Sequence, residues 1–252
     1  MRTIEPPRPA DLPALAALWR EAFDDCDEAF LHDFFRYGFA PDRCRCVRAE
    51  GRIAAMVNWF WYGDAAYLYG VATAADFRRQ GLCRMLLADT CKVLAAAGAS
   101  SAVLIPADEA LARAYGTMGF APISEMALRR MRAGEKPAAL TPLPWRDYRE
   151  KSRALVPRAV NFPDPRHDGF AECQVAAFSG DGFTLAADRA ALAAGTLENA
   201  VLLGNPAAGP GILAALGVPE GTFTLCAPGP GTAMGRRLTG QGAVPPFFPA
   251  FG

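Results

Sequence analysis

The sequence predicts an α/β protein in which a domain of alternating strands and helices is followed by a smaller α+β domain. Apolar residues make up 52% of the 252 residues, which is enough for a packed core. Strand and helix patterns alternate over the first half of the chain. Turn-forming residues are concentrated in the second half, where 14 of the 21 prolines and 16 of the 24 glycines lie from residue 134 onward. We therefore expect two domains, residues 1–133 and 137–252.

Composition and charge exclude several classes of partner. Lys+Arg and Asp+Glu are balanced at 26 each, so the chain has no net basic field for nucleic acid or an anionic membrane. No apolar run approaches the ~20 residues that a membrane span needs. Seven cysteines without framework spacing fit a reducing cytoplasm, and only two histidines are present to bind a metal. We expect a cytoplasmic protein that binds neither nucleic acid, membrane nor metal.

The first domain is expected to alternate strands with helices. The segment from 52 to 62 is apolar nearly throughout, as a strand buried on both faces should be, and Glu50-Gly51 would join it to the strand before it. The expected strands are 44–47, 52–62, 67–73, 101–105 and 123–131. The expected helices are 9–23, a short one around Phe34, one that opens at Arg79–Gly81, and one from Asp108 through Tyr115.

One stretch, Tyr67 to Leu87, combines a strand, a basic turn and the start of a helix. Gly70 interrupts the strand, and a glycine there often marks a bulge or a close backbone approach. The first free N–H groups of a helix and its dipole favour an anion, and Gly81 lets a ligand approach the backbone. The sequence therefore predicts an anion site with three nearby cations, Arg78, Arg79 and Arg84.

The spacing of this turn separates it from other phosphate-binding loops. One glycine is too few for a Rossmann fingerprint, and the Gly-Lys-Ser/Thr of a Walker A loop is absent. The turn instead reads Arg-x-x-Gly-x-small, from Arg78 to Cys83, after a strand that ends Gly-Val-Ala-Thr. In a second motif, Ala114 to Phe120, a tyrosine is followed four residues later by Gly-Phe. Together the two motifs resemble the GNAT superfamily of acyl-CoA-dependent N-acetyltransferases, over residues 1–132.

This resemblance implies a fold and an acetyl-CoA site. The fold would be a mixed, mostly antiparallel central sheet flanked by helices. The strand backbone would hold the pantetheine arm, and the loop amides would hold the pyrophosphate. Two positions depart from the family pattern, because Cys83 stands where Gly or Ala is usual and Asp108 where Asn is common. The cofactor-binding residues so implied are Val71, Ala72, Thr73, Arg78, Arg79, Gln80, Gly81, Leu82, Cys83, Arg84 and Asp108.

Direct transfer of an acetyl group to a primary amine, in a ternary complex, is the reaction that the resemblance implies. Tyr115 matches the family position whose hydroxyl faces the cofactor sulfur, and a phenol with a reference pKa near ~10 can protonate a thiolate. No Ser/His/Asp set is visible, so no acyl-enzyme is expected. Four carboxylates between the first two helices are expected to attract a cationic acceptor: Asp24, Asp25, Asp27 and Glu28.

The second half looks most like that of the enhanced-intracellular-survival type of GNAT protein, whose members carry a second, cofactor-free GNAT-like domain. It would then be a degenerate GNAT half, although an unrelated α+β module explains the pattern nearly as well. Its turn from Asn205 to Pro210 has no basic residue, so no second cofactor site is expected. The tail from Ala243 has three phenylalanines and is expected to pack on the body or on a partner chain, which leaves a homo-oligomer open.

Two other functions remain open at this point. The protein would be a non-catalytic acyl-CoA-binding sensor if the departures at Cys83 and Asp108 abolish turnover, but the retained Tyr115 argues against this. It would be a structural domain if acetyl-CoA does not bind. The sequence does not identify the amine acceptor.

Overall fold

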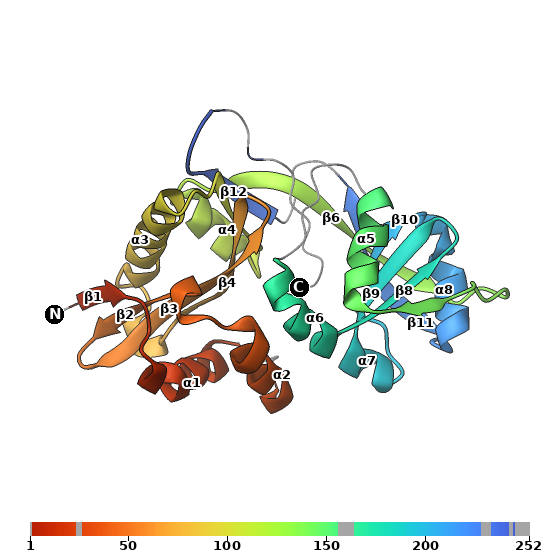
Figure 1. The fold of residues 1–252 in the computed structure, drawn as a ribbon, viewed down its shortest axis with the longest axis horizontal. Helices are drawn as coiled ribbons and strands as arrows, with labels where there is room; N and C mark the ends of the chain where they lie inside the picture. The colour runs from red at the N-terminus through yellow and green to blue at the C-terminus, as the bar shows by residue number, and fades with distance from the viewer. Residues whose placement is uncertain (1, 24–26, 156–163, 228–232, 242–243, 245–252) are drawn as a thin grey trace. The chain divides into compact units, whose positions relative to one another are not determined.

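The computed structural model describes residues 2–23, 27–155, 164–227, 233–241 and 244 (Figure 1). The chain divides into two compact units. Unit 1 holds the described residues up to Ala121 together with those from Met234 to Val244, and unit 2 holds those from Pro122 to Ala233. The tail after residue 244, for which packing on the body or a partner is expected, lies outside the described residues.

Unit 1 contains a six-stranded sheet in which only β4 and β5 pair in parallel. The strand order is β1-β2-β3-β4-β5-β12. Its strands are β1 (Arg2–Glu5), β2 (Cys44–Ala49), β3 (Arg52–Tyr62), β4 (Ala65–Thr73), β5 (Ser101–Leu104) and β12 (Ala233–Arg237). Its α-helices are α1 (Leu12–Ala22), α2 (Glu28–Asp33), α3 (Leu82–Ala96) and α4 (Glu109–Gly116). The mixed, mostly antiparallel sheet predicted from the sequence is confirmed.

Helices cover both faces of this sheet (Figure 1). On one face Phe34, at the end of α2, contacts the ring of Phe60 on β3 with ring centroids 6.4 Å apart. On the other face Arg45 of β2 forms an ion pair with Asp89 of α3. Because β3 is covered on both sides, its residues Ile53–Phe60 are all buried, as the apolar sequence of this strand predicts.

Unit 2 contains a second six-stranded sheet with the order β7-β8-β9-β10-β11-β6. Again only one pair, β10 and β11, is parallel. Its strands are β6 (Ala121–Arg132), β7 (Thr141–Leu143), β8 (Val175–Gly180), β9 (Phe183–Asp188), β10 (Ala200–Gly204) and β11 (Glu220–Ala227). Its α-helices are α5 (Trp145–Leu155), α6 (Asp168–Gln174), α7 (Arg189–Ala193) and α8 (Gly209–Leu216).

The two sheets have the same strand order and the same strand directions. In each, three antiparallel pairs are followed by a parallel pair, which is joined by α3 in unit 1 and by α8 in unit 2, and the sixth strand is antiparallel. This agreement supports the interpretation of the second half as a degenerate GNAT half. Each sheet takes its sixth strand from the part of the chain that follows the other unit. β6 follows α4 of unit 1 but belongs to the sheet of unit 2, and β12 follows β11 of unit 2 but belongs to the sheet of unit 1. The contacts therefore divide the chain at Ala121/Pro122 and again at Ala233/Met234, and not at the expected boundary between residues 133 and 137.

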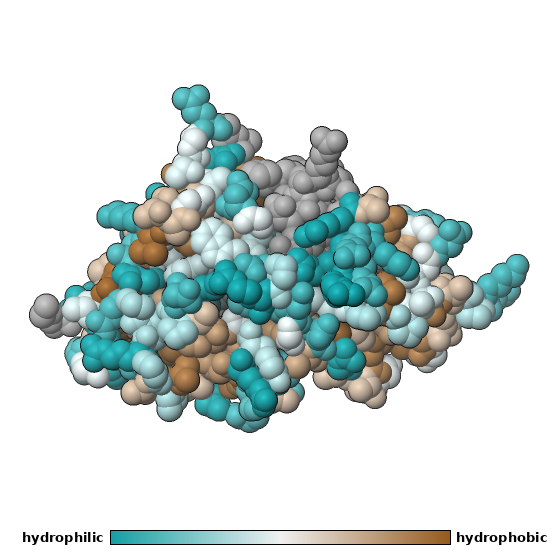
Figure 2. Space-filling view, in the orientation of Figure 1, coloured by the Kyte–Doolittle hydropathy of each residue, from teal (hydrophilic) through white to brown (hydrophobic). Residues whose placement is uncertain are grey.

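The surface in view mixes hydrophilic and hydrophobic residues (Figure 2). In the described part of the chain, no helix is long and apolar enough to cross a membrane. The same residues contain no cluster of His, Cys, Asp and Glu that could hold a metal ion.

A β-bulge in β4 is the main irregularity of the first sheet. Met56 of β3 pairs with Ala72 of β4, and Asn58 of β3 pairs with Tyr69 of β4. Two residues of β4, Gly70 and Val71, therefore lie opposite the single β3 residue between Met56 and Asn58. Gly70 has φ +60°, and a Cβ at this position would lie 2.5 Å from a ring carbon of Trp19 in α1. Gly70 thus serves both purposes predicted from the sequence, a bulge and a close backbone approach.

We predict that Gly70→Ala lowers the free energy of unfolding by about 2–4 kcal/mol, measured by urea denaturation. About 1–2 kcal/mol comes from placing an L side chain at positive φ, and the rest from displacing Trp19, a buried ring that contacts four other aromatic rings. Gly51→Ala is the matched control, since Gly51 has φ +81° and no atom within 4 Å of its added Cβ. An equal loss of unfolding free energy in the two variants would contradict the close approach of Trp19 to Gly70.

Candidate active site

The loop between β4 and α3 exposes backbone N–H groups at a helix start. Gly81 is the N-cap residue of α3, with φ +78° and no capping side chain. The N–H of Met85 donates to the Gly81 carbonyl at 3.0 Å, so the three preceding N–H groups, of residues 82–84, have no carbonyl within the helix. No atom lies within 4 Å of the place where a Gly81 Cβ would be. An anion can therefore approach these N–H groups closely.

The cations predicted for this site have different roles in the structure. Arg79 is exposed, adopts φ +61°, and has no hydrogen bond or ion pair to the described residues. Arg78 donates from Nε to the Thr73 carbonyl at 3.0 Å, which closes the loop. Arg84 points to the end of α4, where its guanidinium donates to the Thr117 carbonyl and hydroxyl at 2.9 and 2.7 Å. Arg79 is thus available to a ligand, whereas Arg84 holds α3 to the end of α4.

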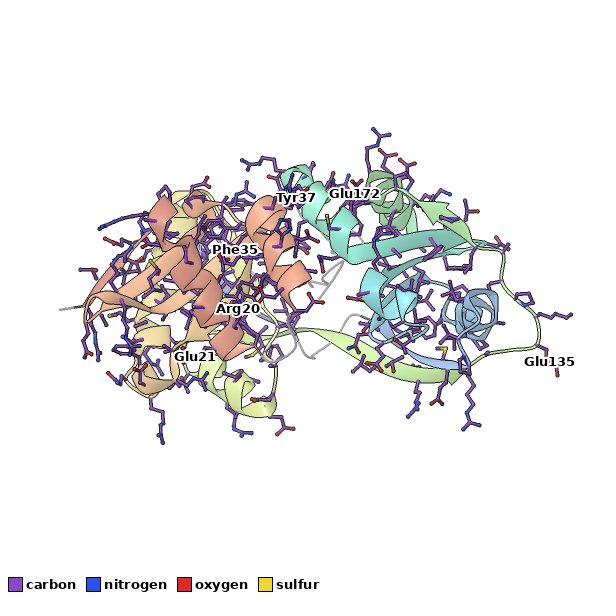
Figure 3. The ribbon with its side chains drawn as sticks, turned by 90° about the horizontal axis from the view of Figure 1, so that it is seen from below. Arg20, Glu21, Phe35, Tyr37, Glu135 and Glu172 are labelled. Atoms are coloured by element: carbon purple, nitrogen blue, oxygen red, sulfur yellow. The ribbon has the colours of Figure 1, made fainter. Side chains whose placement is uncertain are left out.

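Side chains from outside the motif brace the same loop. Gln80 accepts a hydrogen bond from Arg2 through Oε1 and donates from Nε2 to the Asp76 carbonyl at 2.9 Å. Glu21, in the last turn of α1, accepts a hydrogen bond from the Ala75 N–H at 2.5 Å (Figure 3). The sequence analysis missed Arg2 and Glu21, because neither belongs to a motif and both reach the loop only through the tertiary fold.

Beyond the bulge, β4 pairs with no other strand of the described residues on the side away from β3. Its parallel pairing with β5 ends at Tyr67 and Val103, yet β4 continues to Thr73. Val71 and Thr73 are half-buried and Ala72 is buried. The three residues predicted to hold a pantetheine arm therefore lie on a stretch of strand that β5 does not cover.

Tyr115 lies in the last turn of α4 and is 6% exposed. Its carbonyl accepts hydrogen bonds from the N–H groups of Met118 and Phe120, at 2.8 and 3.2 Å, which fixes its backbone. Burial, reinforced by the Cys83 thiol and the Asp108 carboxylate, raises the pKa of Tyr115 well above its usual value near 10. The side chain is therefore a protonated phenol at neutral pH, able to donate.

The two departures from the family pattern have clear structural roles. Asp108 is the N-cap of α4, and its Oδ1 accepts a hydrogen bond from the Leu111 N–H at 2.7 Å. Cys83 is half-buried at the start of α3, and burial raises the pKa of its thiol to about 11, although Arg84 partly opposes this shift. A thiol that is protonated at neutral pH is a poor nucleophile, which agrees with a packing role for Cys83.

The acidic turn is only partly described, because Asp24 and Asp25 lie outside the described residues. Asp27 is the N-cap of α2 and accepts from the Phe30 N–H at 2.7 Å. Glu28 accepts two hydrogen bonds from Arg20, at 2.6 and 2.7 Å, and Arg20 keeps the pKa of Glu28 below its usual value. Both described carboxylates thus have local partners, which weakens the prediction that the turn attracts a cationic acceptor.

Comparison with known families identifies the first half of the chain. Residues 3–123 match the family model of an acetyltransferase (GNAT) domain. Residues 3–123 are therefore a GNAT acetyltransferase domain. Acetyl transfer from an acyl-CoA is the general activity of this family. No curated protein matches the sequence significantly.

Solved structures resemble the chain over nearly its whole length. A GCN5-related N-acetyltransferase from Kribbella flavida has a TM-score of 0.63 at 13% identity, over 94% of this chain and 72% of that one. A putative acetyltransferase from Pyrococcus horikoshii has a TM-score of 0.64 at 13% identity, over 95% and 90%. Eis1 from Mycobacterium abscessus has a TM-score of 0.56 at 12% identity, over 94% and 74%. At these identities the likeness concerns the fold, and it extends over both units.

The second unit lacks the features that make the GNAT domain a candidate site. The pairing of β9 with β10 runs without a register shift from Ala186/Val201 to Phe183/Gly204. The turn before α8 has no basic residue, and Pro210 lies in the first turn of that helix. These differences agree with the expectation of a single cofactor site.

We predict that Cys83 reacts with iodoacetamide only slowly near pH 7 and that its rate rises until about pH 11, where the raised thiol pKa lies. The thiolate is the reactive form, so the raised pKa moves the rise to higher pH. Mass spectrometry of the labelled peptides measures the rate at each pH. In guanidinium chloride the midpoint should fall to about 8.5, the value of a free thiol. A midpoint below pH 8 in the folded protein would contradict the described environment.

Proposed function

We propose that the protein is an acetyl-CoA-dependent N-acetyltransferase that acetylates a primary amine by direct attack in a ternary complex. The observation that carries the proposal is a combination of three features. The second half of β4 is bulged and is not paired with β5, the start of α3 has no capping side chain, and α4 contains a buried phenol. Arg84 of α3 binds the end of α4 and so holds the two helices together. Acetyl-CoA supplies an activated acetyl thioester. The residues present fit it, because the space at Gly81 leaves the helix start open to a phosphate.

Each part of the site has a role in binding. The backbone of residues 71–73 offers N–H and C=O groups to the pantetheine amides along the uncovered edge of β4. The free N–H groups of residues 82–84 bind the pyrophosphate, and Arg79 adds a positive charge that has no partner in the described part of the chain. Arg2 and Glu21 hold the loop in place from outside, through Gln80 and Ala75.

Proton transfer is the main task of the side chains. A backbone N–H at the bulge would polarise the thioester carbonyl. The amine attacks the carbonyl carbon, the carbon–sulfur bond breaks, and the sulfur leaves with the bonding electrons. Tyr115 donates its phenolic proton to this thiolate, since its raised pKa keeps the proton in place at neutral pH. The attacking nitrogen releases its proton to solvent, and solvent returns a proton to the Tyr115 phenolate.

A cytoplasmic location and a homo-oligomeric state remain proposals. The first is supported by free thiols at five described cysteines: Cys44, Cys46, Cys83, Cys91 and Cys173. Size-exclusion chromatography with light scattering measures the second.

We predict that Gly81→Val raises the Kd of acetyl-CoA at least tenfold, measured by calorimetry, because the new side chain blocks the N–H groups of α3. Gly98→Val is the matched control, as Gly98 follows the other end of α3 with φ +91° and an equally open Cβ position. Both variants carry the same backbone strain. Circular dichroism checks the fold of each. Equal acetyl-CoA affinity in the two variants would show that the start of α3 does not bind the phosphates.

We predict that Tyr115→Phe lowers kcat by about 10²–10⁴-fold, the usual contribution of a general acid, while the Kd of acetyl-CoA changes little. The substitution keeps the ring and its contact with Phe120, and removes only the hydroxyl. CoA release with a panel of amines (spermidine, kanamycin, phenethylamine and a short peptide) measures turnover. A wild-type rate in the variant would exclude Tyr115 as the proton donor. A wild-type protein that binds acetyl-CoA and turns over none of the amines would favour the non-catalytic sensor.

A further inference from the structure

The turn that follows α4 is held by arginines from two other elements. Arg84 of α3 donates to the carbonyl and the hydroxyl of Thr117, and Arg236 of β12 donates from Nη1 to the Met118 carbonyl at 2.9 Å. The Arg236 side chain also lies over Gly119, where an added Cβ would be 3.6 Å from its Nε. All of these residues belong to the same compact unit, unit 1.

A helix as short as α4 depends on contacts at its ends. It has 8 residues, fewer than the ~12–15 that an isolated helix needs in water. Asp108 caps its start, and the last carbonyls of a helix need donors from outside it. Arginine side chains commonly supply such donors at a helix C-terminus. The two arginines therefore fix the end of α4, where Tyr115 lies.

Tyr115 is coupled directly to the same turn. Its carbonyl accepts hydrogen bonds from the N–H groups of Met118 and Phe120, at 2.8 and 3.2 Å. Its ring lies 6.1 Å, between centroids, from the ring of Phe120. A displacement of the turn would thus move both the backbone and the ring of Tyr115.

Arg236 comes from a distant part of the chain. β12 follows β11 of unit 2, but it pairs with β5 of unit 1, where Arg236 lies opposite Ala102. This pairing fixes the backbone from which the side chain reaches Met118. The two GNAT motifs, at residues 78–83 and 114–120, therefore do not contain all of the groups that hold Tyr115.

We infer that Arg236 is a positioning residue for acetyl transfer, which acts through the turn after α4 and holds the Tyr115 phenol where it protonates the leaving thiolate. This inference rests on the proposed function. Arg84 shares the role from α3. A misplacement of about 1 Å at a reacting group can lower a rate ~10²-fold, so loss of one such contact is measurable. A GNAT unit without β12 would keep its cofactor loop and lose this hold on its proton donor.

The first test measures turnover of the full chain with Arg236→Met, which keeps an apolar side chain and removes the guanidinium. With an amine that the wild type acetylates, kcat should fall by about 10–10²-fold, while the Kd of acetyl-CoA changes by less than about twofold. In the Tyr115→Phe background the same substitution should lower kcat by less than about twofold, because the group that Arg236 positions is already absent. Arg236→Lys keeps a donor for the Met118 carbonyl and should restore most of the lost kcat.

Two further readouts do not depend on turnover. In the protein without cofactor, the N–H groups of Met118 and Phe120 should exchange at least about tenfold faster in Arg236→Met than in the wild type, because the turn is released. With CoA bound to the wild type, the ultraviolet absorbance of the thiolate should give a CoA thiol pKa about one pH unit below that of free CoA, since the phenol donates to the charged form. This difference should shrink in Arg236→Met and disappear in Tyr115→Phe.

Arg189→Met is the matched control. Arg189 also donates to backbone carbonyls, those of Glu172 and Val175, at 2.9 and 2.8 Å, but it lies in unit 2. Its replacement should lower the Tm and leave both kcat and the pKa of bound CoA unchanged. Arg236→Gln, which is shorter and neutral, takes the place of Arg236→Met if methionine does not pack.

Two results would overturn the inference. Equal losses of kcat from Arg236→Met in the wild-type and Tyr115→Phe backgrounds would make Arg236 a structural residue. An unchanged pKa of bound CoA in Arg236→Met, together with unchanged exchange at Met118 and Phe120, would show that Tyr115 does not depend on β12. If the wild type acetylates none of the amines, these last two readouts decide the inference. Failure of CoA to bind the wild type would instead contradict the proposed function, and is seen before any variant is compared.

Discussion

The backbone of β4 pairs with neighbouring strands on both sides only as far as Tyr67, and on one side after it. Backbone N–H and C=O groups need partners wherever they are shielded from water, so the second half of β4 is completed by something other than β5. The bulge at Gly70 adds one residue to this half and brings it against Trp19 of α1. The loop and the start of α3 follow this strand directly, and their proposed roles depend on it.

Repetition of the fold makes the contrast between the two units informative. Both sheets place a parallel pair after three antiparallel pairs, so the topology alone does not produce a cofactor site. Among the described residues, β4 has a bulge against β3 whereas the pairing of β10 with β9 has no register shift, and the turn before α3 has arginines whereas the turn before α8 has no basic residue. Arg79 combines a positive φ of +61° with a charge that has no partner among the described residues, and both features agree with the proposed phosphate site.

Much of the GNAT domain could be predicted from local sequence. The hairpin at Glu50-Gly51 has φ of +52° and +81°, and the apolar run of β3 is buried as expected. The exchange of β6 and β12 could not be predicted, because strand pairing over such distances leaves no local pattern, and Ala233–Arg237 is a weak strand sequence of small and charged residues. The partners of Arg84 and Asp27 likewise depend on contacts that spacing does not encode.

Hydrogen exchange of the full chain, with and without acetyl-CoA, tests most directly whether the open half of β4 and the start of α3 form the cofactor site. Binding should slow exchange of the backbone N–H groups of residues 71–73 and 82–84, because the cofactor replaces water as their partner. The corresponding segments of unit 2, at the end of β10 and the start of α8, should exchange at the same rate in both states. Protection in unit 2 without protection in β4 would contradict the assignment of the site.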